Sequence, residues 1–392
     1  MPTVARVGAQ PFAVTYKPAV LASGDYGGLN FVTTWTPSIK SHLSIALLEE
    51  QAPGFQTANS VAATGRCNNA GVGFAAGSAC RGDDYAVMLG IEMTPMKGLD
   101  IRPIFAYFNG FGSITASGRA PAALPASTNL VDEESRYTVG VDTRWTLGNL
   151  FIDPTFFYQF GHRESRPAAP SPTTAHRSHA DINAWLFDIR GGYRMGPLLL
   201  EAMFAYVSGN KARDNLAKEI SYYAPIDTDS GYGAVWQNVL ALGVDSTSVG
   251  AVDGMGAQIS YFQYGRIQGG ARATYSWTPA LDTYVTVSPT WTAREVDTDS
   301  AAATRAKTCI GNGASGIPCD FEGDSSYLGT EANVGLIWRF APGLRFDLVG
   351  YYFFAGSALD AAEVITAAPT ATGATRDARD AMGIGSKLSF SF

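Results

Sequence analysis

The stretch RYTVGVDTRWTL at positions 136–147 alternates between two kinds of side chain. Apolar and aromatic residues such as Tyr137, Val139 and Trp145 fill one set of alternate positions, whereas the charged Arg136 and Asp142 fall in the other set. Successive side chains of a β-strand point to opposite faces. The stretch therefore predicts a strand with one apolar face and one charged face.

The same two-residue period recurs at residues 85–94, 185–194 and 281–294. Only 16% of the 392 residues are charged, although 12% are aromatic and 43 are glycine, and the mean hydropathy is +0.01. A disordered chain carries more charge and fewer aromatics, and no window approaches the roughly 18 consecutive apolar residues of a membrane-spanning helix. Composition therefore excludes both a disordered chain and a helical membrane protein.

The connections between these stretches alternate in length. Short turns fall at residues 36–41, 95–98, 148–149, 196–197, 279–280 and 341–343, and long polar segments lie at residues 51–83, 110–134, 162–180, 209–268, 296–328 and 356–379. Outer-membrane barrels have short turns at one end and long loops at the other. The alternation therefore predicts up-and-down antiparallel hairpins of that kind.

Four of the seven tryptophans lie within a few residues of a short turn, namely Trp35, Trp145, Trp277 and Trp338. An indole at the membrane–water boundary keeps its ring in lipid and its N–H in water. These residues could instead close strand ends in a soluble core, but their repetition at one end of successive hairpins favours an aromatic girdle.

The hairpins, with an N-terminal strand within residues 4–16 and a final strand within residues 380–392, bring the expected total to about 14 strands. Both termini are then on the short-turn side. Residues 209–268 could hide a further hairpin, around residues 236–242 and 259–264, which raises the total to about 16. Alternatively, residues 210–221 are a short polar helix in a loop that folds into or over the pore.

The four cysteines form two local pairs in Gly- and Ala-rich segments, Cys67 with Cys80 and Cys309 with Cys319. An even number in short loops indicates two disulfides and an oxidising compartment. A zinc site is the alternative, but neither pair has C-x-x-C spacing and no histidine lies beside either. The start of the chain has no basic region followed by an apolar core, so we expect a signal peptide to have been removed.

The last residues, KLSFSF, alternate apolar and polar side chains and end on Phe392. This end resembles the targeting strand of bacterial outer-membrane proteins, which implies that the barrel-assembly machinery reads Phe392. The whole chain resembles a Gram-negative outer-membrane porin. Residues 156–161, 181–185, 192–194 and 206–209 are similar to the alginate-export-like barrels, in which Tyr-Gln-Phe-Gly and Tyr-x-Ser-Gly strand ends flank a long loop. Porin resemblance also implies contact with outer-membrane lipid and lipopolysaccharide, and a homotrimer.

The charged faces of the strands are expected to line the lumen, because a charge facing lipid costs about 2–4 kcal/mol near the midplane. We expect most of these charges to form ion pairs across the wall and a minority to set ion preference. The pore-lining candidates are Arg136, Asp142, Arg144, Asp188, Arg190, Arg194, Asp282, Arg294, Arg339 and Asp347.

Catalytic and cofactor motifs are sparse. The pair His176 and His179 could hold a metal, but no helix orients it, and His162 near Ser165 lacks a third group to orient the imidazole. The chain has neither a phosphate-binding glycine loop nor a haem-attachment motif. Basic residues form no stripe that could follow a nucleic-acid backbone. We expect no enzyme activity, no cofactor, no bound metal and no nucleic-acid partner.

The sequence therefore predicts one domain over residues 1–392, a transmembrane antiparallel β-barrel in a bacterial outer membrane. Its predicted function is passive diffusion of small hydrophilic solutes or ions through a polar lumen that residues 209–268 narrow. Two other functions stay open: a barrel sheath around a multihaem cytochrome, and a transporter of hydrophobic small molecules. The second should carry an N-terminal plug, whereas only about 25 residues precede the first hairpin.

Overall fold

The computed structural model describes residues 1–17, 20–49, 84–114, 129–167, 178–214, 216, 218–228, 232, 236–240, 263–298, 323–365 and 370–391. Fourteen strands follow one another in a single sheet, and every neighbouring pair on this path is antiparallel. In order they are β1 (Thr3–Ala13), β2 (Ala22–Thr36), β3 (Ile39–Glu49), β4 (Asp84–Met96), β5 (Leu99–Ile114), β6 (Asn129–Leu147), β7 (Leu150–Pro167), β8 (Ser178–Met195), β9 (Leu198–Val207), β12 (Arg266–Thr278), β13 (Leu281–Val296), β14 (Ser325–Ala341), β15 (Leu344–Ala355) and β18 (Ala381–Phe390). The predicted up-and-down sheet of about 14 strands is confirmed.

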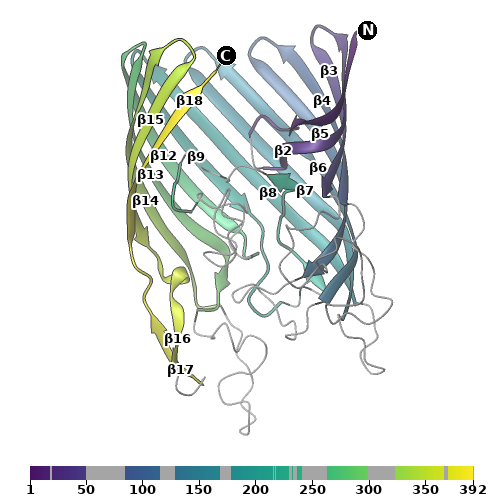
Figure 1. The fold of residues 1–392 in the computed structure, drawn as a ribbon, viewed down its shortest axis with the longest axis vertical. Coiled ribbons are helices and arrows are strands. Elements are labelled where there is room, and N and C mark those ends of the chain that lie inside the picture. Colours follow the sequence, from purple (N-terminus) through teal and green to yellow (C-terminus); the bar gives the residue numbers. More distant parts are fainter. Residues whose placement is uncertain are drawn as a thin grey trace.

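The short turns fall where the sequence places them. Two residues separate the strands of each such hairpin, and Gly148 and Gly196 adopt the positive φ that these tight turns require. Both chain ends lie beside these turns: the N–H of Thr34 donates to the carbonyl of Pro2, and the N–H of Ser391 donates to that of Gly343. Figure 1 shows both termini at this end, as predicted.

The tilted strands curve around a common interior (Figure 1). The two end strands, β1 and β18, form no ladder with each other among the described residues. No helix in the described part of the chain is long and apolar enough to cross a membrane.

The two faces of the sheet differ as the alternation predicts. Along β8, Ile182, Leu186 and Asp188 are buried, whereas Trp185 is exposed and Phe187 is partly exposed. The buried positions lie on the concave, inner face, and the exposed apolar positions lie on the outer face. The sheet thus turns its apolar face outward, the reverse of the pattern in a water-soluble sheet.

Two segments cover the inner face. The first, which we call the strap, is the described part of residues 14–21 between β1 and β2. The second, which we call the inner segment, is the described part of residues 208–240 between β9 and β12. It contains β10 (Glu219–Ile220), which pairs with β8, and β11 (Asp227–Thr228), which pairs with β2. Because β3 to β7 separate β2 from β8 in the sheet, the inner segment crosses the interior.

A hydrophobic core fills the space between these two segments and the inner face of the sheet, whose strands we call the wall. Its members include Leu21 of the strap, Tyr223 and Trp236 of the inner segment, and Met88 and Leu186 of the wall. The expected polar helix at residues 210–221 is wrong for the described part of that range, which forms turns and β10 because Asn210 and Asp214 hydrogen-bond main-chain groups. Residues 236–240 form turns, so the described part of the proposed extra hairpin is not a strand.

The last long connection carries a separate hairpin. It follows the short 3-10 helix Ser357–Leu359 and consists of β16 (Ala361–Ile365) and β17 (Thr370–Arg376), which pair only with each other.

Candidate functional site

The middle of the inner face is a set of polar wall side chains that hold the strap and the inner segment. On β7, the buried Gln159 accepts a hydrogen bond from the N–H of Ala224 at 3.1 Å through Oε1, and donates to the carbonyl of Ala224 at 2.7 Å through Nε2. One side-chain amide thus pairs with the inner segment as a neighbouring strand would. Arg136 donates to the same Oε1 at 3.1 Å.

Arg136 also belongs to a buried charge cluster. The two oxygens of Glu134 lie 2.6 Å from the guanidinium nitrogens of Arg136 and Arg163, and Arg163 donates to the Tyr222 hydroxyl at 2.9 Å. All three charged side chains are less than 10% exposed. The charges therefore compensate one another beneath the inner segment.

Asp188 on β8 joins the strap to the inner segment. Its Oδ1 lies 3.1 Å from Nζ of Lys17, and its Oδ2 lies 3.1 Å from Nη2 of Arg190. The hydroxyl of Tyr232 donates to Oδ2 as well. Burial raises the pKa of Tyr232 well above its ordinary value of 10.0, so this phenol stays a donor.

Three wall residues grip the main chain of the strap. Asp142 accepts from the N–H of Tyr16 at 2.5 Å, Arg144 donates to the carbonyl of Tyr16 at 3.1 Å, and Arg102 donates to the carbonyl of Val14 at 2.9 Å. The two guanidinium carbons lie 4.1 and 4.2 Å from the centre of the Tyr16 ring. Burial raises the pKa of Tyr16 to about 12.

Strands β13 and β14 hold the C-terminal end of the inner segment. Both oxygens of the buried Glu331 on β14 accept main-chain N–H groups, from Asn238 at 2.5 Å and from Val239 at 2.7 Å. Gln237 donates to the carbonyl of Ser288 at 3.0 Å. The inner segment is therefore fastened to β7, β8, β13 and β14.

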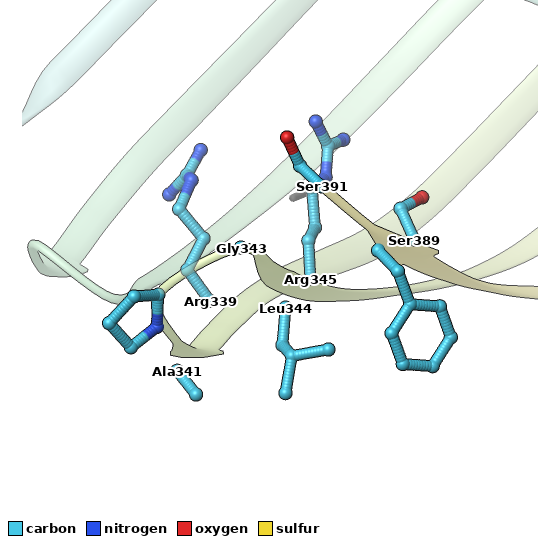
Figure 2. A pocket seen from close by; sticks show the side chains of 9 residues that line it. Arg339, Ala341, Gly343, Leu344, Arg345, Ser389 and Ser391 are labelled. Carbon is cyan, nitrogen blue, oxygen red and sulfur yellow. The ribbon is translucent and has the colours of Figure 1, made fainter.

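Near the short turns the charges are more open. Arg339 pairs with Asp282 at 2.8 Å, and Arg345 pairs with Asp347 at 2.8 Å; the two arginine side chains are nearly half exposed. Figure 2 shows Arg339 and Arg345 pointing to one side of a hollow of about 400 Å³, with Leu344 on the opposite side. The candidate Arg194 is exposed at the same end, whereas the exposed Arg294 lies near the long-connection end of β13.

The outer face carries two bands of aromatic side chains. Toward the long connections, rings contact one another from strand to strand: the centroids of Tyr107 and Tyr137 lie 4.9 Å apart, and those of the stacked Tyr137 and Phe160 lie 5.3 Å apart. Toward the short turns lie the exposed tryptophans Trp35, Trp145, Trp277 and Trp338. Tyr137 and Trp145 are eight residues apart on β6, which is about 27 Å along a strand and about 21 Å across a membrane at a tilt of about 40°.

Two histidines lie together on the outer face, whereas His42 lies on the inner face, 3.8 Å from Glu92. The rings of His162 and His179 stack 5.2 Å apart, and His179 lies 3.3 Å from Asp181. No group of three or more His, Cys, Asp or Glu in the described part of the chain is arranged to hold a metal. His176, Phe392 and the four cysteines lie outside the described residues, so the disulfide pairs and the assembly signal stay predictions.

No family model and no curated protein matches this chain. Among solved structures, it is similar to OccAB4 of Acinetobacter baumannii, with 10% identity and a TM-score of 0.42 over 98% of this chain and 70% of that one. It is similar to OccK10 (OpdN) of Pseudomonas aeruginosa, with 10% identity and a TM-score of 0.43 over 91% and 76%. The outer membrane protein OprD of the same organism gives 12% identity and a TM-score of 0.41 over 91% and 70%. These likenesses are too distant to assign a function.

Proposed function

We propose that this chain forms an outer-membrane β-barrel through which small hydrophilic solutes or ions diffuse passively. The observation that carries the proposal is the orientation of the sheet, which buries its charges inside and leaves its apolar side chains outside. Val287 on β13 is 50% exposed, while Ser288 beside it is fully buried. A continuous apolar face of this size on a soluble monomer would be an interaction surface, and the two aromatic bands identify its partner as a lipid bilayer.

The spacing of the aromatic bands supports this assignment. About 21 Å between Tyr137 and Trp145 fits the apolar band of roughly 25 Å in barrels of this class. Aromatic rings at both limits anchor a barrel at the two boundaries of the bilayer. Lipopolysaccharide would then meet the outer face at the long-connection end, and the short turns would face the periplasm.

The inner contacts divide the pore-lining candidates into two groups. Arg136, Asp142, Asp188 and Arg190 are occupied in holding the strap and the inner segment, and we assign them to fixing the constriction. Arg144 holds the strap with a side chain that stays exposed. We assign the remaining candidates to ion preference. Arg194, Asp347 and Arg339, with its largely buried partner Asp282, lie near the short turns, and the exposed Arg294 lies near the long connections.

Planar lipid bilayers test the proposed function. Purified, refolded protein should produce stepwise conductance increments at neutral pH, and the same protein after heat denaturation should produce none. Absence of conductance from protein that has inserted into vesicles, together with haem absorbance in the native complex, would instead support a cytochrome sheath. A homotrimer stays a prediction, which cross-linking in native membranes can test.

A further inference from the structure

The ammonium group of Lys17 sits in a site that the wall supplies entirely. The side chain is 5% exposed, although it belongs to a connection between two strands. Its Nζ donates to the carbonyl oxygen of Asp153 at 2.5 Å and to the Thr155 hydroxyl, and it lies 3.1 Å from Oδ1 and 3.3 Å from the carbonyl oxygen of Asp188. All four acceptors come from β7 and β8, and none comes from the strap.

The acceptors are held in place by groups other than Lys17. Thr155 donates to Oδ1 of Asp142 at 2.6 Å, which turns its lone pairs toward the ammonium. Asp188 is fixed by Arg190 and by the Tyr232 hydroxyl. The site is therefore preorganised, since removal of Lys17 leaves each acceptor with a partner that fixes its orientation.

The strap around Lys17 is also held through its main chain. Arg102, Asp142 and Arg144 bind the peptide groups of Val14 and Tyr16, contacts that do not depend on which side chains the strap carries. Lys17 is the strap residue that inserts a charged head group into the wall. Its ammonium group occupies the site as a ligand would, while the peptide chain keeps it attached.

We propose that β7 and β8 form a binding site for a primary ammonium group, and that Lys17 fills this site as a tethered ligand that keeps the strap across the passage. Small alkylammonium ions are the soluble ligands of this site when the head group of Lys17 is absent or withdrawn. The chemistry fits because a primary ammonium has three N–H donors for a carboxylate, a hydroxyl and main-chain carbonyls. A tetraalkylammonium ion has no such donor.

Chemical rescue of Lys17→Ala tests the site without any channel measurement. The variant in detergent micelles should unfold at a lower temperature than the wild type, and propylammonium chloride should raise its midpoint by about 2 °C or more. Tetramethylammonium or potassium chloride at equal ionic strength should not. The double variant Lys17→Ala/Asp188→Asn should show no rescue, and Lys211→Ala, which removes an exposed lysine of the inner segment, should behave as the wild type. If all three salts raise the unfolding midpoint equally, or if propylammonium does not raise it, the proposed ammonium site is wrong.

Hydrogen exchange of the wild-type strap gives a second measurement if the variant does not refold. Propylammonium at high concentration should accelerate exchange of the Lys17 region, because it competes with a tethered group whose effective concentration is roughly millimolar or more. Tetramethylammonium should leave exchange unchanged. Identical exchange in both salts overturns the proposal.

The gating part rests on the proposed function. In planar bilayers, Lys17→Ala should conduct more than the wild type, and propylammonium should return it toward the wild-type level. Unchanged conductance overturns the gating role. If neither protein conducts, the proposed function fails, while the thermal measurement still decides whether the ammonium site exists.

Discussion

Gln159 on β7 pairs with Ala224 of the inner segment through both atoms of its side-chain amide, at 3.1 and 2.7 Å. The peptide of Ala224 thereby makes two hydrogen bonds to the wall without a neighbouring strand. Gln159 has no exposed surface, so water cannot replace either contact. The position of Ala224 inside the sheet thus depends on a side chain 65 residues away in the sequence.

Replacement of Gln159 by leucine should release this part of the inner segment. The change leaves the N–H of Ala224 without its partner and its carbonyl with only the 3.5 Å contact to Arg136, which destabilises the docked state by about 1–3 kcal/mol. Limited proteolysis should then cut within residues 208–240 faster than in the wild type. Gln10→Leu is the matched control, because Gln10 bonds only main-chain oxygens of its own hairpin. Equal cleavage of Gln159→Leu and wild type would contradict the assigned role.

Alkaline pH should destabilise the folded protein through the buried phenols. Burial raises the pKa of Tyr16 from 10.0 to about 12 and raises those of Tyr223 and Tyr232 as well. A raised folded-state pKa gives stability that is complete below pH 10 and is lost as pH rises through about 12. Midpoints from thermal unfolding should fall across this range.

Tyr16→Phe isolates one phenol. The Tyr16 hydroxyl has no hydrogen-bond partner among the described residues, so the variant should match the wild type near pH 8. Its midpoint should fall less steeply than that of the wild type between pH 10 and 12. Parallel curves for the two proteins would show that Tyr16 titrates normally.

Lys17 should change the stability with pH in the direction opposite to the buried tyrosines. Burial, assisted by Arg190, lowers its pKa below 10.5, despite the attraction of Asp188 and Asp142. The docked strap therefore binds fewer protons than the released strap, and docking strengthens as pH rises toward 10.5. The difference in thermal midpoint between wild type and Lys17→Met, which share all tyrosines, should widen from pH 8 to pH 10. A difference that narrows would contradict the lowered pKa.

Arg339→Gln should change ion preference more than stability. The ion pair with Asp282 is partly exposed, so its loss should change unfolding free energy by less than about 1 kcal/mol. Asp282 then stays as an unbalanced negative charge near the short turns. The reversal potential in a salt gradient should shift toward cations, whereas Lys97→Gln, in an exposed turn, should leave it unchanged. A shift toward anions would contradict the assignment of Arg339 to the passage.

Val287→Arg tests which face meets lipid. An arginine near the bilayer midplane costs about 2–4 kcal/mol, and near the interface about 0–1 kcal/mol. Val287 lies mid-strand on the outer face, and Thr283→Arg, on the same face nearer the short turn, is the control. Urea titration of folding into lipid vesicles measures both, and equal losses would contradict the proposed membrane orientation.

The sequence predicts the strands of the sheet far better than it predicts the segments that lie against the inner face. Two-residue alternation is a local property, so residues 136–147 reveal both their strand and its faces. The strap could not be found in this way: the expected strand within residues 4–16 is β1, but nothing local marks its end at Ala13. Tyr16 and Lys17 meet partners 126 and 171 positions away, at Asp142 and Asp188. No periodicity within residues 14–21 reports such distant contacts.

The inner segment shows the same limit. Its polar composition indicates a loop, and its course over the inner face was expected from its length. The residues that hold it, Gln159 and Glu331, cannot be distinguished in the sequence. Any polar side chain on the inner face of a strand fits the same two-residue alternation. They become recognisable only when Ala224 and Asn238 are placed against them.

The pairing of Lys17 with Asp188 also imposes an order on biogenesis. Tyr16 needs Asp142 of β6, Lys17 finds its place only once β8 has joined the sheet, and β11 must reach back to pair with β2. Contacts of such long sequence separation form slowly. The first connection of the chain is therefore among the last to settle, and an assembly intermediate that stops before β8 would have a hollow, unobstructed interior.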